Sequence, residues 1–164
     1  MLIKTLVENT SISRDYEMEH GLSLYIETKR HKLLFDTGAS PLFLENARKL
    51  QVDLAEVDMA FISHGHYDHG GGLETFLNIN SKAKVFLHNR AFEKRYAYWT
   101  NGDKTDKKFI GLDAGLLPND RFILVGDNLV IDEDLELFLG VKAEKLNPSG
   151  NRDLLVEVGT ELIP

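Results

Sequence analysis

Four residues that can bind a metal ion occur within six consecutive positions, in the run His64-Gly65-His66-Tyr67-Asp68-His69. A short apolar stretch, residues 59–62, precedes this run, and three glycines follow it. Residues two apart in an extended chain point to the same side, so His64 and His66 can both direct an imidazole at one ion. A turn after them would let Asp68 and His69 face a second position nearby. The run therefore predicts a metal site with room for up to two ions.

The alternative is that these residues lie on the surface or hydrogen-bond within the fold, which is the usual explanation of a single histidine. Four such residues side by side are different, because burying them without a cation would cost a few kcal/mol for each polar group. Imidazole and carboxylate ligands suit zinc, iron, manganese or nickel, and the chain has no cysteine to narrow the choice. We expect a divalent metal, with zinc as the first candidate.

Composition favours a single globular domain over residues 1–164, because 43% of the residues are hydrophobic and can form a core. The net charge of -7 gives no basic patch for nucleic acid, so a small-molecule substrate is the expected partner. No apolar run approaches the length of a membrane span, and no leader precedes residue 9. We expect a cytoplasmic protein that does not enter a membrane.

Strands alternate with helices along the chain. Residues 22–27 and 31–35 have the pattern of a β-hairpin, and Ser40-Pro41 are typical of the N-cap and first turn of a helix that follows. We predict strands at 2–8, 58–63, 84–88, 121–125, 129–131, 136–139 and 154–158, and a short helix starting at Leu73.

Residues 94–108 alternate between polar and aromatic side chains and predict a long surface loop. This loop could act as a lid over a site or be an ordinary insertion, and no periodicity decides between the two. Tyr67, Tyr96 and Trp99 are candidates to line a substrate pocket, with ordinary packing as the alternative for each.

Two motifs carry a family resemblance. Phe35-Asp36-Thr37-Gly38, followed by the run from Ser63 to Leu73, resembles the first two signature motifs of the metallo-β-lactamase superfamily. Residues 19–24 and 88–92 resemble the branch that includes a dihydropterin ribofuranosylaminobenzene phosphate synthase of methanopterin synthesis. The resemblance implies an α+β fold, the αββα four-layer sandwich, of which this chain would carry about the N-terminal half.

The resemblance also implies roles for individual residues. His64 and His66 would bind a first metal ion, Asp68 and His69 would bind a second, and Asp36 would brace the loop through hydrogen bonds. Asp68 would in addition act as the catalytic residue that orients the nucleophile. The implied activity is a metal-dependent hydrolase that attacks a small-molecule ester, phosphoester or lactone with a metal-activated water.

The sequence also departs from the family pattern. Members continue into a second half that supplies further histidine and aspartate ligands, and we expect those C-terminal motifs to be missing here. His20, His31 and His88 are not convincing replacements, so we expect a homo-oligomer or a separate C-terminal half to complete the site. Two alternatives stay open: a transferase-like enzyme of pterin cofactor synthesis, and a non-catalytic truncated remnant that binds metal weakly.

Overall fold

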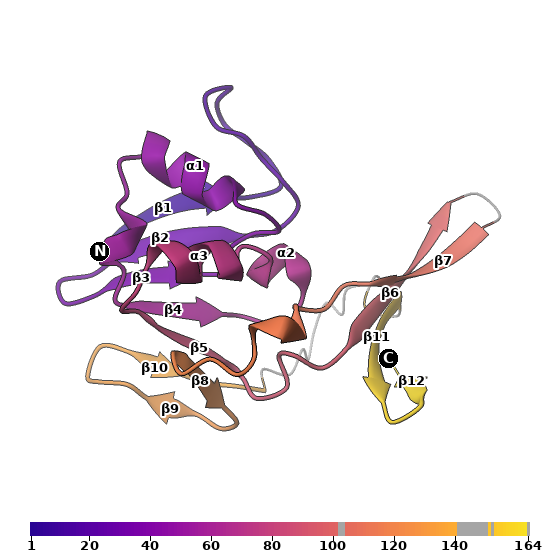
Figure 1. The fold of residues 1–164 in the computed structure, drawn as a ribbon. Coiled ribbons are helices and arrows are strands. Elements are labelled where there is room, and N and C mark those ends of the chain that lie inside the picture. The colour runs from indigo at the N-terminus through magenta and orange to yellow at the C-terminus, as the bar shows by residue number, and fades with distance from the viewer. Residues whose placement is uncertain (102–103, 141–150, 152, 164) are drawn as a thin grey trace.

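A six-stranded mixed sheet forms the centre of the computed structural model, which describes residues 1–101, 104–140, 151 and 153–163 (Figure 1). Its strands follow the order β1-β2-β3-β4-β5-β8. The first three strands pair antiparallel, and β3, β4, β5 and β8 pair parallel. The bounds are β1 Leu2–Val7, β2 Ser23–Glu27, β3 Lys32–Phe35, β4 Met59–Ile62, β5 Lys84–His88 and β8 Phe122–Val125.

Helices cover one face of this sheet (Figure 1). They are α1 Leu42–Lys49, α2 Tyr67–Gly70 and α3 Leu73–Ile79, with short 3-10 turns at Leu54–Glu56 (η1) and Ala114–Leu116 (η2). Phe43 of α1 and Phe76 of α3 are fully buried and pack against Leu34, Ala60 and Val85 of the central strands. The core therefore lies between the helices and the parallel strands that carry the candidate site.

The start of α1 differs slightly from the expected capping pair. Pro41 occupies the N-cap position, one residue later than predicted, and makes no side-chain cap. The Ser40 hydroxyl still accepts a hydrogen bond from the Leu42 N–H at 3.2 Å. Ser40 and Pro41 therefore precede α1 as predicted, and the start of the helix is shifted by one position.

The prediction of a long surface loop at residues 94–108 was wrong. This segment forms the antiparallel hairpin of β6 Arg95–Asn101 and β7 Lys104–Phe109, which joins β11 Leu154–Val158 and β12 Glu161–Ile163 in a second sheet. Tyr96 and Phe109 pack edge to face across the hairpin, with ring centres 5.6 Å apart, and Lys108 Nζ lies 4.4 Å from the centre of the Trp99 ring. Such cross-strand pairs stabilise a ribbon that projects from the main sheet (Figure 1).

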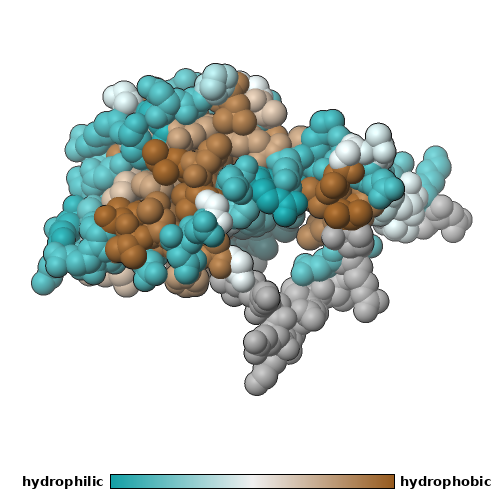
Figure 2. Space-filling model, turned by 90° about the horizontal axis from the view of Figure 1, so that it is seen from below, coloured by the Kyte–Doolittle hydropathy of each residue, from teal (hydrophilic) through white to brown (hydrophobic). Residues whose placement is uncertain are grey.

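The remaining described elements are short. β9 Leu129–Val130 and β10 Glu136–Leu137 form a small hairpin after β8. Viewed from the side of β8 and this hairpin, Figure 2 shows apolar residues gathered in a patch with a polar rim. No helix in the described part of the chain is long and apolar enough to cross a membrane.

Candidate metal centre

Two neighbouring parallel strands end at the candidate site. Asp36 follows β3 directly, and Ser63 and His64 follow β4 directly. Because β3 and β4 pair in register from Leu33 to Phe35, their carboxyl ends meet at one edge of the sheet. The backbone of Asp36 turns there with a φ of 57° while its N–H donates to the Phe61 carbonyl at 2.8 Å.

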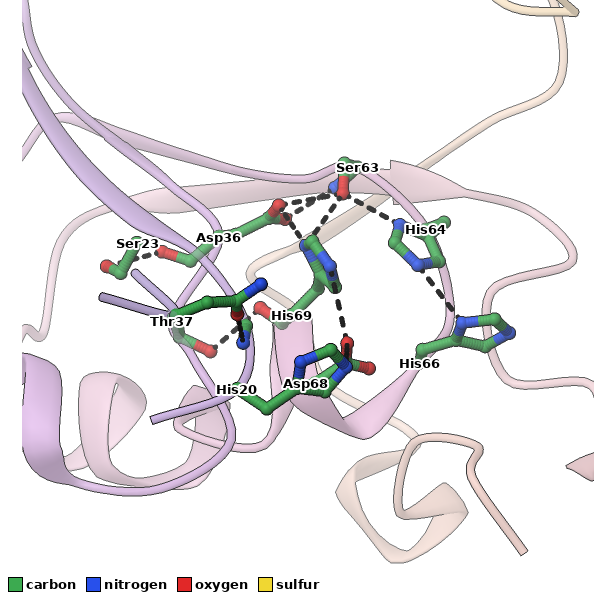
Figure 3. A network of polar contacts seen from close by, with 11 residues as sticks. His20, Ser23, Asp36, Thr37, Ser63, His64, His66, Asp68 and His69 are labelled. Carbon is green, nitrogen blue, oxygen red and sulfur yellow. Dashed lines mark hydrogen bonds and ion pairs between the residues drawn. The ribbon is translucent and has the colours of Figure 1, made fainter. Parts of the chain in front are cut away.

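Asp36 is fully buried beneath the loop and accepts three hydrogen bonds (Figure 3). Its Oδ1 accepts from the Ser63 N–H at 2.7 Å. Its Oδ2 accepts from the Ser63 hydroxyl and from His69 Nδ1, each at 2.7 Å. The carboxylate therefore ties the beginning and the end of the histidine-rich loop to the sheet.

These hydrogen bonds also determine which ring nitrogen of His69 and of His64 donates within the loop. Since Asp36 only accepts, His69 donates from Nδ1, and its Nε2 is the nitrogen left for a metal ion. The Ser63 hydroxyl proton is given to Asp36, so this oxygen accepts from His64 Nδ1 at 2.9 Å and Nε2 is the nitrogen left on His64. Bare imidazole nitrogens are the form that ligates metal ions.

The potential ligand atoms lie in two pairs. His64 Nε2 is 3.1 Å from His66 Nδ1, and His69 Nε2 is 3.5 Å from Asp68 Oδ2. Two ligands of a tetrahedral ion at about 2.0–2.1 Å from it lie about 3.3 Å apart. Each pair therefore has the spacing of two ligands that share one divalent ion.

Charge and burial set the protonation of the three imidazoles. Burial, together with neighbouring His69, lowers the pKa of His64. Burial and the adjacent His64 lower the pKa of His66 to about 4. Burial also acts to lower the pKa of His69, but the hydrogen bond and charge of Asp36 and the charge of Asp68 outweigh it, so this pKa is raised. His64 and His66 are thus neutral at neutral pH.

The donor set fits divalent ions as two pairs of ligands. Among the residues described in the structure, no three His, Cys, Asp or Glu side chains are grouped so that they could already hold one ion. Two protein ligands for each ion are fewer than the three of a typical catalytic zinc site. Further ligands would therefore have to come from elsewhere.

His20, which the sequence analysis set aside as a replacement ligand, lies at this site. Its Nε2 is 3.3 Å from Asp68 Oδ2, on the side of the carboxylate away from the His64–His66 pair (Figure 3). The other two histidines lie apart from the donor atoms. His31 pairs with Asp132 at 2.6 Å in the turn before β3, and His88 ends β5, where its Nδ1 accepts from the Arg90 N–H at 3.0 Å.

A hollow of about 620 Å³ opens beside His64. Its walls are largely apolar and include Phe61 and Phe86, with Arg95 and His88 as polar groups. Tyr67, Tyr96 and Trp99, the candidates for lining a pocket, are not among its lining residues. Tyr96 and Trp99 belong to the β6–β7 hairpin, and Tyr67 begins α2 beside a smaller hollow.

Known proteins match this chain in sequence and in structure. The sequence profile of the metallo-beta-lactamase superfamily matches residues 18–141. An uncharacterised protein of Methanocaldococcus jannaschii is 31% identical over 139 residues, which cover 82% of this chain and 51% of that protein. The 7,8-dihydropterin-6-methyl-4-(beta-D-ribofuranosyl)-aminobenzene-5'-phosphate synthase of the same organism is 34% identical over 103 residues, or 58% of this chain and 35% of the synthase.

A solved structure gives the same result for the fold. A metal-dependent hydrolase of the beta-lactamase superfamily superposes with a TM-score of 0.74 and 32% identity, covering 98% of this chain and 56% of the hydrolase. The chain thus spans about half the length of that protein, and the predicted α+β fold is confirmed as part of the metallo-β-lactamase architecture. This chain belongs to the metallo-β-lactamase superfamily, whose members generally bind divalent metals.

Proposed function

We propose that this chain is the metal-binding part of a metal-dependent hydrolase that acts on a small-molecule ester, phosphoester or lactone. The observation that supports this most is the arrangement of four candidate ligands on one loop, which buried Asp36 holds in place. They form two pairs, His64 with His66 and Asp68 with His69. Zinc is the proposed ion because imidazole and carboxylate ligands suit it, and iron, manganese and nickel are the alternatives.

Bound divalent ions would lower the pKa of a water molecule toward neutrality and neutralise negative charge that develops on the substrate. The residues of this chain contribute orientation. Asp36 and Ser63 hold His64 and His69 with their Nε2 atoms directed away from the sheet. Asp68, whose side chain is 13% exposed, is the proposed catalytic residue that orients the attacking water through its carboxylate.

The proposal includes a partner chain. The sheet has helices on one face, its edge strand β8 carries Leu124, which is 50% exposed, and Figure 2 shows an apolar patch on this side of the molecule. A second copy of the chain, or a separate C-terminal half, would bury this patch and could supply the further ligands that each ion needs. Light scattering on the purified chain tests this, because a stable monomer at all concentrations would argue against association of copies.

A transferase-like role in pterin cofactor synthesis is the second candidate. It is favoured by the 34% identity to the dihydropterin ribofuranosylaminobenzene phosphate synthase. The two candidates share the metal centre and differ in product, since the hydrolase consumes water and the transferase joins two substrates.

Metal content and turnover test the proposal together. The chain is purified without chelator, its metal is measured by elemental analysis, and it is assayed on a phosphate monoester, a phosphate diester and a lactone. We expect bound divalent metal and hydrolysis of at least one substrate, both lost in His66→Ala. The matched control is His31→Gln, which alters a histidine at the other end of β3. Metal-dependent coupling of a 7,8-dihydropterin 6-methyl diphosphate to a 4-(β-D-ribofuranosyl)aminobenzene 5'-phosphate, with release of diphosphate and without hydrolysis of the ester and lactone substrates, would favour the transferase. Bound metal with no turnover in either assay would leave a non-catalytic remnant.

A further inference from the structure

The segment before β2 places one more imidazole against the candidate metal centre. His20 Nε2 lies 3.3 Å from Asp68 Oδ2, and the same oxygen lies 3.5 Å from His69 Nε2. Both separations match the distance of about 3.3 Å between two ligands of a tetrahedral ion. Asp68 Oδ2 is thus flanked by two imidazole nitrogens from segments far apart in the sequence.

Hydrogen bonds on both sides of His20 hold the backbone in this place. Glu19 Oε1 accepts from the Ala39 and Ser40 N–H groups at 3.0 and 3.1 Å. The Leu22 N–H donates to the Asp68 carbonyl at 3.4 Å, and the Leu22 carbonyl accepts from the Gly38 N–H at 2.9 Å. The backbone that carries His20 is therefore attached both to the loop after β3 and to α2.

Gly21 shows how closely the two segments approach. Its φ is +134°, and a Cβ at this position would lie only 2.0 Å from the Asp68 carbonyl oxygen. Its N–H donates to the Asn9 side chain at 2.9 Å. Any residue other than glycine would push the segment away from α2 and carry His20 with it. The neighbouring backbone is thus shaped so that His20 reaches Asp68.

The side chain of His20 itself is not needed for packing. It is 71% exposed, whereas the Asp68 side chain is 13% exposed. An exposed imidazole can change its χ1 and χ2 angles without disturbing a core. It can therefore turn toward an ion beside Asp68 and His69.

We propose that His20 is the third protein ligand of the ion held by Asp68 and His69. This inference rests on the metal centre of the proposed function. Two imidazoles and one carboxylate are a common set for a catalytic zinc site, which keeps a fourth position open for water. The Asp68–His69 position would then be complete within this chain, while the His64–His66 position would still depend on a further ligand.

The competing explanation is that His20 only donates a hydrogen bond to the Asp68 carboxylate. Two substitutions separate the explanations. His20→Gln keeps an N–H donor that can reach Asp68 but is a poor metal ligand, whereas His20→Ala removes both functions. His31→Gln is the control, because it makes the same chemical change at a histidine remote from the site.

The test titrates the purified chain and its three variants with Co²⁺, followed by visible absorption and by competition with a chelator of known affinity. We expect His20→Ala and His20→Gln to weaken the binding of one ion by tenfold or more, with His31→Gln unchanged. In the unsubstituted chain labelled with ¹⁵N, the His20 Nε2 resonance should shift on addition of Zn²⁺.

The outcomes that overturn the inference are distinct. Parent-like Co²⁺ affinity in both His20 variants overturns it and leaves the metal centre in place. Parent-like affinity in His20→Gln alone shows that His20 positions Asp68 by a hydrogen bond and is not a ligand. An unsubstituted chain that binds no Co²⁺ overturns this inference and the proposed metal centre together.

Discussion

Replacing Asp36 by asparagine changes one acceptor atom into a donor while it keeps the shape of the side chain. Asn also tolerates the left-handed backbone, so the φ of 57° at this position adds no strain. If the amide oxygen stays at the Oδ2 position, the new NH₂ group faces the Ser63 N–H, and two donors meet. If the amide flips, the NH₂ group faces His69 Nδ1, which must then give up its proton to Nε2.

The flipped arrangement keeps every hydrogen bond once the Ser63 hydroxyl also reverses, so that it accepts from the amide and donates to His64 Nδ1, and it is therefore the one expected. It converts three charge-assisted hydrogen bonds of 2.7 Å into neutral ones. Since a hydrogen bond to a charged group contributes about 1.5–3 kcal/mol and a neutral one about 1, the loss is about 0.5–2 kcal/mol for each bond, and the free energy of unfolding should fall by roughly 1.5–6 kcal/mol in all. For a chain of this size that lowers the melting temperature by roughly 3–24 °C.

Asp36→Asn should weaken metal binding more than it weakens the stability of the fold. In the flipped arrangement His69 Nε2 carries a proton and cannot act as a ligand, so we expect Asp36→Asn to lose about 10- to 100-fold in metal affinity. Asp36→Ala leaves three donors without their acceptor, at about 1–3 kcal/mol each, and should cost about 3–9 kcal/mol in stability. Calorimetric titration with Zn²⁺ and thermal melts of the metal-free chain measure the two effects, with Asp53→Asn at the exposed cap of η1 as control. Parent-like metal affinity in Asp36→Asn would refute the bracing argument.

Three further expectations follow from the same contacts. His66→Ala should lose most bound metal with a small change in melting temperature, and unchanged metal content would exclude His66 as a ligand. Because burial lowers the pKa of His66 to about 4, below the value near 6.5 of an unfolded histidine, the unfolded chain takes up a proton first as the pH falls from 6.5 to 4. Over that pH range the free energy of unfolding of the metal-free chain should therefore fall more steeply than that of His66→Asn. Equal slopes of unfolding free energy against pH, measured by denaturant titration, would contradict this. Asn80 is fully buried and donates to the Leu54 and Val57 carbonyls at 2.9 Å, so Asn80→Ala should lower the free energy of unfolding by about 3 kcal/mol. A melting temperature within 2 °C or so of the parent would show that water replaces the amide.

The two pairs of candidate ligands could be located from the sequence because their residues are neighbours in the chain, and their role as ligands stays a prediction. His64, His66, Asp68 and His69 lie on one loop, and the apolar run before it marks the strand that ends there. Asp36 directly follows a different strand, β3, and was identified through the family motif. Hydrophobic periodicity alone does not predict that β3 and β4 are neighbours in the sheet. Strand and helix positions along the main sheet followed the apolar pattern for the same local reason.

His20 could not be found in this way, because its contact with Asp68 depends on how a long irregular segment folds back over α2. The only local signal was the glycine that follows it, and one glycine has many explanations. The hairpin of β6 and β7 was missed for a different reason. Its aromatic and charged residues suggested a loop, although the sequence Gly102-Asp103, which separates the two segments that pair, is a typical two-residue hairpin signal.

The β7 strand has a consequence for how copies of this chain can meet. It is the last strand of the second sheet, and its residues are exposed along their length. The open edge of such a strand is a template for edge-to-edge aggregation, and lysines are a common natural protection against it. Lys104, Lys107 and Lys108 place three positive charges on this strand. Copies that approached through β7 would repel one another, so the association proposed above would be favoured at the apolar patch beside β8 and disfavoured at this edge of the second sheet.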